Sequence, residues 1–318
     1  MNISRLRWII LIISFLVLVF GGLTGLYLGR FLPTFICCYV GGHLSSGTCF
    51  LRPLQSSLSY SSWESYKYLG EIFLYFSLLV ILIGRAWCGW ICPFGFLQDA
   101  LDLIRKKLRL GYLNFSEGVR AGLRCIKWIF LFIALLLPLW AAFPVFAPSV
   151  AMEFSVPFCH LCPGKYILPL VTADFSWVAV NYKNAATITL TIIGLVFSAL
   201  VIVGALMKRR FWCPYCPMGL LLSWYRKISF IKLKKDCRKC TMCGICYNVC
   251  PVEIKQVFKE REREDVTFTD FTLCLKCVEY CPEDDVLKAT FLGKTIYRST
   301  SEGFFSRQNI MTALPEKK

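Results

Sequence analysis

Residues 84–95, GRAWCGWICPFG, stand where an apolar run of the chain ends and a basic stretch begins. The chain has 318 residues, 56% of them hydrophobic, and its mean hydropathy of +0.56 exceeds that of an ordinary soluble domain. Long uncharged runs account for this value, so the composition predicts an integral membrane protein. The two thiols of the stretch, Cys88 and Cys92, are therefore expected at the mouth of a membrane segment.

Four apolar stretches are long enough to cross a bilayer as helices, namely residues 8–28, about 68–84, about 128–146 and 185–207. The net charge of +16 comes largely from basic residues that flank these runs. We interpret this charge by the positive-inside rule and not as a sign of nucleic-acid binding. Because the loop 85–124 and the residues after the fourth run hold most of the flanking charge, both termini and that loop are predicted to face the cytoplasm.

The opening stretch has a counterpart later in the chain. Residues 210–219, RFWCPYCPMG, follow the fourth apolar run as residues 85–95 follow the second, and each motif leads into an apolar segment with basic residues. Upstream of each repeated run are further cysteines on the outer side. The membrane part, residues 1–229, is therefore predicted to be two repeated helical hairpins, with outer cysteines at Cys37, Cys38, Cys49, Cys159 and Cys162.

The composition changes at about residue 230, where the apolar runs stop. Residues 237–251, CRKCTMCGICYNVCP, contain the Cys-x2-Cys-x2-Cys-x3-Cys-Pro spacing of bacterial [4Fe–4S] ferredoxins, and residues 273–282, LCLKCVEYCP, form a shorter second run. Zinc sites instead use paired Cys-x2-Cys units. We therefore predict a small α+β domain with two [4Fe–4S] clusters over residues 230–295, followed by a tail over 296–318.

The eight cysteines of these runs suffice for two clusters, although Phe271 stands where the second run lacks its first cysteine. Cys237 is an additional cysteine of the first run, and its assignment rests on this arithmetic alone. A three-iron cluster and a non-cysteine ligand are the alternatives. We assign Cys240, Cys243, Cys246 and Cys281 to cluster A, and Cys250, Cys274, Cys277 and Cys237 to cluster B.

Two further cysteine groups leave alternatives open. The inner group would hold another Fe–S cluster at the membrane face, or its Cys-Pro motifs would be structural turns with buried thiols. The outer group would form a cluster site or, in an oxidising exterior, disulfides. The histidines His43 and His160 also fall outside, where a lone loop histidine seldom binds a metal. The inner group is Cys88, Cys92, Cys213 and Cys216; the outer group is Cys49, Cys159, Cys162 and Cys38, with Cys37 as the alternative to Cys38.

On these motifs the chain resembles the membrane polyferredoxins, the family of 4Fe–4S proteins similar to NapH and MauN. The stretches that carry the resemblance are residues 84–99, 158–165 and 209–219 and the two ferredoxin runs. The resemblance implies four helices, a cytoplasmic ferredoxin domain and electron transfer to or from a membrane redox chain. The motif at Cys213 and Cys216 departs from the family pattern, because two residues separate its cysteines where three are usual.

We therefore expect a one-electron carrier in the cytoplasmic membrane. It would exchange electrons with an acidic soluble partner, such as a ferredoxin or flavodoxin, and with quinone, an oxidoreductase subunit or an outer acceptor. Other subunits of a redox complex are expected as partners, and nucleic acid is not. The alternatives are a maturation factor that reduces a metal for a partner metalloenzyme and an Fe–S redox sensor.

Overall fold

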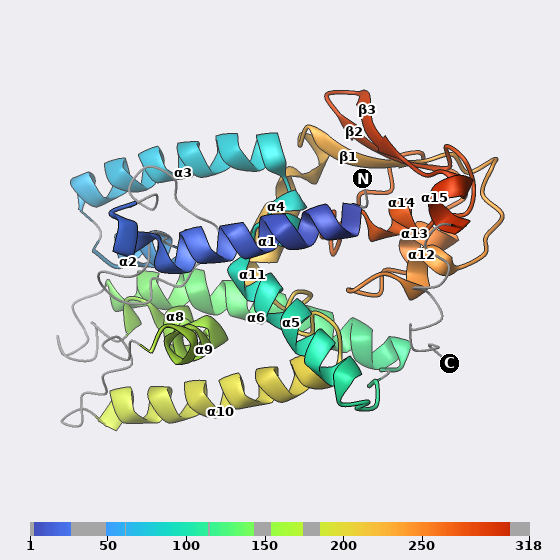
Figure 1. Cartoon of the computed structure of the whole chain (residues 1–318). Coiled ribbons are helices and arrows are strands. Elements are labelled where there is room, and N and C mark those ends of the chain that lie inside the picture. The colour runs from blue at the N-terminus through green and yellow to red at the C-terminus, as the bar shows by residue number, and fades with distance from the viewer. Residues whose placement is uncertain are drawn as a thin grey trace.

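The computed structural model describes most of the chain, and in this part it is mainly helical (Figure 1). Four helices are long and apolar enough to cross a membrane, as expected. The first and third begin earlier than the apolar pattern predicted, because α1 starts at Ile3 and α6 at Glu117. The long helices are α1 (Ile3–Phe20), α3 (Trp63–Ile83), α6 (Glu117–Ala141) and α10 (Ala185–Met207). The described residues are 3–26, 49–60, 62–113, 115–142, 154–173 and 185–305.

Short helices at one end of the bundle carry the Cys-Pro motifs. They are α4 (Ala86–Trp90), α5 (Pro93–Lys107) and α11 (Pro217–Trp224). Cys92 and Cys216 are the N-cap residues of α5 and α11, each followed by proline at the first helical position. Proline favours this position because its missing N–H would have no intrahelical partner there. Each Cys-Pro pair therefore ends a turn and starts a helix.

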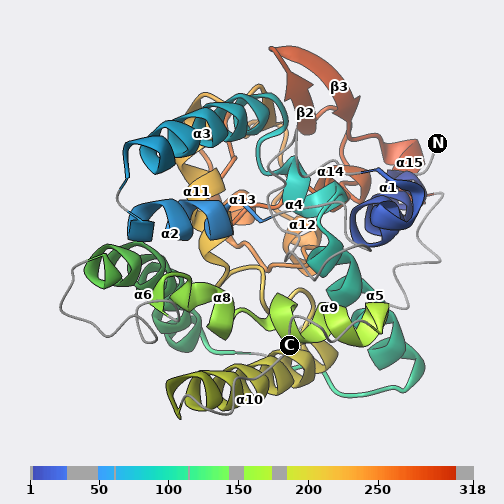
Figure 2. The same ribbon diagram turned by 90° about the vertical axis from the view of Figure 1, so that its left-hand side faces the viewer.

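The other half of the bundle holds three more short helices: α2 (Leu51–Tyr60), α8 (Pro157–Leu161) and α9 (Pro163–Thr172). Figure 2, which looks along the bundle from this side, shows them within the ring of long helices. Tyr166 of α9 is buried, and a Cβ added to Gly194 of α10 would lie 2.4 Å from its hydroxyl oxygen. The glycine allows α9 to pack directly on a membrane-spanning helix.

The C-terminal region is built on a three-stranded antiparallel sheet in the order β1 (Ile231–Lys235), β2 (Leu287–Phe291), β3 (Lys294–Arg298). Leu292 and Gly293 connect β2 to β3, both with positive φ, 49° and 81°, as a two-residue hairpin turn requires. The sheet and α15 (Ser301–Phe305) continue past residue 296, where the sequence predicted a tail. Two one-turn helices lie within the cysteine runs, α12 (Ile245–Asn248) and α14 (Lys276–Glu279), and a third, α13 (Gln256–Lys259), lies between the runs.

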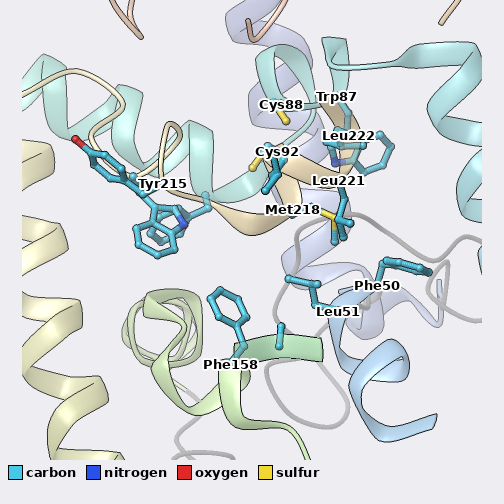
Figure 3. Close-up of a cluster of buried hydrophobic side chains, with 14 of the residues drawn as sticks. Phe50, Leu51, Trp87, Cys88, Cys92, Phe158, Tyr215, Met218, Leu221 and Leu222 are labelled. Carbon is cyan, nitrogen blue, oxygen red and sulfur yellow. The ribbon is translucent and has the colours of Figure 1, made fainter. Parts of the chain in front are cut away.

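The membrane part and the C-terminal region each have their own hydrophobic core. The core of the membrane part is formed by residues of the long helices, the Cys-Pro helices and the segments at α2 and α8. Figure 3 shows Cys88 and Cys92 on one side of this core, Met218 within it, and Leu51 and Phe158 on the opposite side. The core of the C-terminal region is separate and includes Cys250, Cys277 and Cys281.

Buried charges join the C-terminal region to the membrane part. Glu253, only 2% exposed, forms ion pairs of 3.0 Å with both Arg120 and Lys208. Asp270 pairs with Lys127 at 2.7 Å. Breaking such a pair strands a buried charge, which typically costs about 3–5 kcal/mol. Part of the basic charge beside the membrane helices therefore fixes the position of the C-terminal region.

Candidate metal centres

The four cysteines assigned to cluster A line one open cavity of about 380 Å³ in the C-terminal region. Met242 and Gly244 adopt positive φ, 59° and 75°, which lets the loop between the first three cysteines turn tightly. Burial raises the pKa of the Cys246 thiol to about 12. A metal centre here would therefore displace protons from its ligands as it bound. The cavity contains Cys240, Cys243, Cys246 and Cys281 in its wall.

A second cavity of about 310 Å³ adjoins the first and contains three cysteines of cluster B, Cys250, Cys274 and Cys277. Cys246 lines both cavities. The backbone N–H of Ile254 donates a hydrogen bond of 3.5 Å to the sulfur of Cys250. Such N–H···S bonds stabilise thiolate charge and are one means by which proteins set cluster potentials.

Cys237 is not in the wall of this second cavity. Its sulfur lies 3.5 Å from the carbonyl oxygen of Arg263 and 3.8 Å from that of Glu260, across a surface loop. Phe271, at the position of the missing cysteine, lines the cavity instead. The structure thus does not bring the assigned fourth ligand to cluster B, because the strand and loop before Cys240 direct Cys237 elsewhere.

A third cavity of about 370 Å³ lies where the membrane bundle meets the C-terminal region. Both repeated motifs contribute to it, as the sequence predicted for a shared site. Its wall also contains Arg85, Gln98 and Trp212. Burial raises the pKa of the Cys213 thiol to about 11. The four cysteines that line it are Cys88, Cys92, Cys213 and Cys216.

Hydrogen bonds to sulfur orient two of these thiols. The N–H of Gly95 donates to Cys92 Sγ at 3.3 Å. Gln98, 2% exposed, donates from Nε2 to Cys213 Sγ at 3.6 Å, while its Oε1 accepts the backbone N–H of Trp212 at 2.8 Å. Sequence analysis missed Gln98. The sequence feature that could have indicated Gln98 is its position, six residues after Cys92 on the buried face of an amphipathic helix.

Two arginines from equivalent repeat positions differ in their charge partners. Arg210, fully buried, donates to Asp99 Oδ1 and Oδ2 at 3.0 and 2.8 Å and to the carbonyl of Cys88 at 2.8 Å. Arg7 donates to Asp99 as well. Arg85 is 4% exposed and lines the third cavity with Cys88, and its Nε has no hydrogen-bond partner among the described residues. Arg85 is thus a second buried cation at this site, in the wall of the third cavity and without a carboxylate partner among the described residues.

The second and third cavities meet at a backbone contact. A Cβ added to Gly89 would lie 2.3 Å from the carbonyl oxygen of Thr272 and 3.1 Å from the nitrogen of Cys274. Trp90 Nε1 donates to the carbonyl of Leu273 at 2.9 Å. Thr272 lines both cavities. The three cavities therefore form one continuous series from the C-terminal region to the membrane bundle.

The described cysteines of the outer group, Cys49, Cys159 and Cys162, lie at the short helices α2, α8 and α9. Cys49 and Cys162 pack against the core of the membrane part. No disulfide joins any two of the described cysteines. His160 contacts Lys165, with 3.1 Å between Nδ1 and Nζ. The other residues of this prediction, Cys37, Cys38 and His43, lie outside the described residues.

Within the described ranges, no group of three or more His, Cys, Asp or Glu side chains is arranged to hold a single metal ion. The cysteines line cavities instead, as ligands that bind different iron atoms of one cluster would. A family model described as a 4Fe-4S binding domain matches residues 72–111 and 190–236, the stretches with the Cys-Pro motifs. This match identifies a 4Fe–4S binding domain in a chain with four helices long and apolar enough to cross a membrane, which suggests a multi-pass membrane protein.

More specifically, the chain is similar to two ferredoxin-type proteins, NapH and MauN, and to the protein YccM. It is 27% identical to the methylamine utilization ferredoxin-type protein MauN of Methylorubrum extorquens, over 92% of this chain and 90% of MauN. Identity to the ferredoxin-type protein NapH of Escherichia coli is 26%, over 81% of this chain and 83% of NapH.

YccM of Escherichia coli, named as a candidate electron transport protein, is 25% identical over 65% of this chain and 51% of YccM. The chain thus spans about half the length of that relative. No solved structure matches the chain.

Proposed function

We propose that the protein is a membrane-anchored iron–sulfur protein that relays single electrons between a soluble partner and a redox partner in the membrane. The observation that carries this proposal is the continuous series of cysteine-lined cavities. Cys246 is shared by the first and second cavities, and Thr272 by the second and third. A series of this kind would give electrons a short route from the C-terminal region to the bundle.

The residues of each cavity fit an iron–sulfur cluster, which supplies a one-electron carrier when bound. The thiolates would hold the iron. The N–H groups of Gly95, Gln98 and Ile254 donate to cysteine sulfurs, which would stabilise the more negative, reduced form. Arg85 would offset the charge of the thiolates in the third cavity.

The third cavity is proposed as a cluster site in addition to clusters A and B. Its support is that the family model for 4Fe–4S binding matches its two Cys-Pro stretches and not the ferredoxin runs. For cluster B, Cys250, Cys274 and Cys277 are the protein ligands we propose, with the fourth position filled by a non-cysteine ligand or absent in a three-iron cluster.

The duplicated architecture also belongs to the proposal. Residues 1–229 would be two copies of a helical hairpin, and residues from 230 a ferredoxin domain that extends to α15. Reciprocal contacts support the duplication: a Cβ on Gly95 would lie 3.3 Å from Arg210 Nη2, and one on Gly219 would lie 3.2 Å from Arg85 Nη2. The positive-inside rule supports a cytoplasmic location for the ferredoxin domain and both termini.

The soluble partner is proposed to be an acidic electron carrier, and further subunits of a redox complex would complete the route in the membrane. The net charge of +16 would attract such a carrier at low ionic strength. Association rates that do not change with salt would count against this choice of partner.

The test uses the full chain, purified without oxygen and placed in liposomes that contain a quinone. Wild-type protein, reduced and separated from excess reductant, should transfer electrons to the quinone. The Cys213→Ala/Cys216→Ala variant should bind about four fewer iron atoms per chain and transfer electrons at least about tenfold more slowly. Equal iron content and equal rates would refute a carrier in the third cavity.

A further inference from the structure

Three cysteines that the ferredoxin runs and the third cavity do not use lie inside the helical bundle. Cys49 precedes α2, Cys159 is in α8, and Cys162 is the N-cap residue of α9. The helices α8 and α9 both pack on α10. A Cβ on Gly194, within the membrane-spanning part of α10, would lie 2.4 Å from the carbonyl oxygen of His160. The segment from Cys159 to Cys162 is therefore beside a membrane span.

A buried glutamine connects these segments. Gln55 of α2 is 0% exposed. Its Nε2 donates to Cys159 Sγ at 3.6 Å and to the carbonyl of Leu51 at 2.8 Å. Its Oε1 accepts the backbone N–H of Phe158 at 3.1 Å. Every polar atom of this buried side chain is thus used to orient one thiol and the residue before it.

Gln98 makes the same set of contacts in the third cavity. Its Nε2 donates to Cys213 Sγ at 3.6 Å and to the carbonyl four residues earlier, that of Phe94, at 3.4 Å. Its Oε1 accepts the N–H of Trp212, the residue before that cysteine. In both sites, a glutamine therefore connects one helix to a Cys-x2-Cys-Pro motif through three equivalent hydrogen bonds.

The sequence spacing of the two sites agrees as well. Gln55 follows Cys49 by six positions, as Gln98 follows Cys92. Residues 158–163, FCHLCP, correspond to residues 212–217, WCPYCP. The backbones agree too, because Cys162 has φ −69° and ψ 123°, and Cys216 has φ −67° and ψ 122°.

The two sites are also close to each other. Cys49 and Cys162 pack on the core that contains Cys88 and Cys92. Cys216, in the wall of the third cavity, is near enough to Cys49 and Cys162 that negative charge on one thiol would disfavour charge on the others. A centre at these cysteines would therefore extend the series of proposed centres into the bundle.

We propose that Cys49, Cys159 and Cys162 bind an iron–sulfur cluster inside the helical bundle, next to Cys216. The choice of cluster rests on the proposed function of the third cavity, whose arrangement this site repeats. Three thiolates hold three iron atoms of a cluster, and the remaining iron would take a ligand from outside this group. The position equivalent to Cys88, four residues before Cys49, is Ser45, which lies outside the described residues.

The test measures iron, acid-labile sulfide and the electron paramagnetic resonance spectrum of the reduced, full-length protein, purified without oxygen. The Cys159→Ala/Cys162→Ala variant should lose three to four iron atoms per chain, about one cluster, and one spectral component. The matched control is Cys125→Ala, which removes an exposed cysteine of α6 and should lose neither. Iron and spectra equal to those of the control, or a Cys159–Cys162 disulfide found by mass spectrometry, would overturn the proposal.

The Cys213→Ala/Cys216→Ala variant separates this proposal from the proposed function. If only the Cys213→Ala/Cys216→Ala variant keeps the wild-type iron content, a cluster in the third cavity is refuted. If only the Cys159→Ala/Cys162→Ala variant keeps it, a cluster in the bundle is refuted. A variant counts only if the ferredoxin signals remain. If the double variant does not fold, Gln55→Leu decides: the midpoint potential of one signal should become more negative while the others stay fixed, and unchanged potentials throughout would overturn the proposal.

Discussion

The guanidinium group of Arg210 lies against Gly95, where a Cβ would come within 3.3 Å of Nη2. The first motif thus leaves room for the arginine of the second. Arg85 stands against Gly219 in the same way, at 3.2 Å. The two arginines differ in their counter-charge. Arg210 is paired with Asp99, whereas the residue equivalent to Asp99 in the second motif is the uncharged Ser223.

This difference predicts that Arg85 sets the potential of the centre in the third cavity. Arg85→Gln removes a buried positive charge beside the thiolates, so the reduced form should become less stable. A nearby opposite charge shifts the pKa of a buried group by about 1–3 units, or about 1.4–4 kcal/mol, and about 1.4 kcal/mol corresponds to about 59 mV for one electron. We expect the midpoint potential of this centre to fall by about 60 mV or more in a redox titration.

Lys107→Gln is the control for Arg85→Gln, because it makes the same charge change at an exposed position of α5. It should leave the potential nearly unchanged. An Arg85→Gln protein with the wild-type potential would show that Arg85 does not act on this centre.

Asp99 is predicted to stabilise the fold through its two arginines. Burial alone would raise the pKa of Asp99, but the charges of Arg210 and Arg7 outweigh burial and hold it well below the ordinary value. Asp99→Asn leaves two arginines buried, at 0% and 1% exposure, without their counter-charge. The free energy of unfolding should fall by about 3–5 kcal/mol, measured by thermal and denaturant unfolding in detergent.

The pH dependence follows from the direction of this shift. Because the folded pKa is depressed, the stabilisation is complete above the ordinary carboxyl value of about 4 and is lost only as the pH falls through the folded value. The difference between wild type and Asp99→Asn should therefore stay constant from pH 8 to about pH 5. Glu302→Gln, an exposed substitution, should cost little at any pH. A difference that vanishes near pH 6 would contradict this account.

Cys237 is predicted to be dispensable for both ferredoxin clusters. Its sulfur faces the carbonyls of Glu260 and Arg263, outside both cavities. Cys237→Ala should retain the wild-type iron content and both ferredoxin signals. Cys281→Ala, which alters the first cavity, should lose about one cluster. Loss of the cluster B signal in Cys237→Ala would restore this cysteine as a ligand.

Much of the fold could be predicted from the sequence, because its determinants are local. Four apolar runs require helices in a bilayer, and α10 has the predicted bounds, Ala185–Met207. The spacing of Cys240, Cys243 and Cys246 likewise reflects a single loop around one cavity. The repeated motifs also indicated which thiols the third cavity would share.

The rest depends on contacts between distant segments. Gln55 and Gln98 are unremarkable in sequence, since their meaning lies in hydrogen bonds to Cys159 and Cys213, more than a hundred positions away. The depth of the Cys159 segment depends on its packing against Gly194, which hydropathy does not reveal. Composition was also misleading after residue 296, where a short polar edge strand looks like a tail.

Gly89 is predicted to control the junction between the second and third cavities. A Cβ at this position would come within 2.3 Å of the carbonyl oxygen of Thr272 and 3.1 Å of the backbone of Cys274. Backbone cannot move aside as a flexible side chain can, so Gly89→Ala should separate the two surfaces locally at a cost of about 1–3 kcal/mol. Electron transfer between the ferredoxin region and the bundle should slow, because tunnelling rates fall steeply with distance.

The measurement is the rate at which each centre is reduced after rapid mixing with a reduced soluble ferredoxin. In Gly89→Ala, reduction of the ferredoxin signals should keep its wild-type rate, and reduction of the centre in the third cavity should lag behind it. Gly122→Ala is the control, because a Cβ there meets nothing within 4 Å. If the centre in the third cavity is reduced as fast in Gly89→Ala as in Gly122→Ala, electrons do not cross at Gly89. The close approach of Gly89 to Thr272 would then serve packing alone.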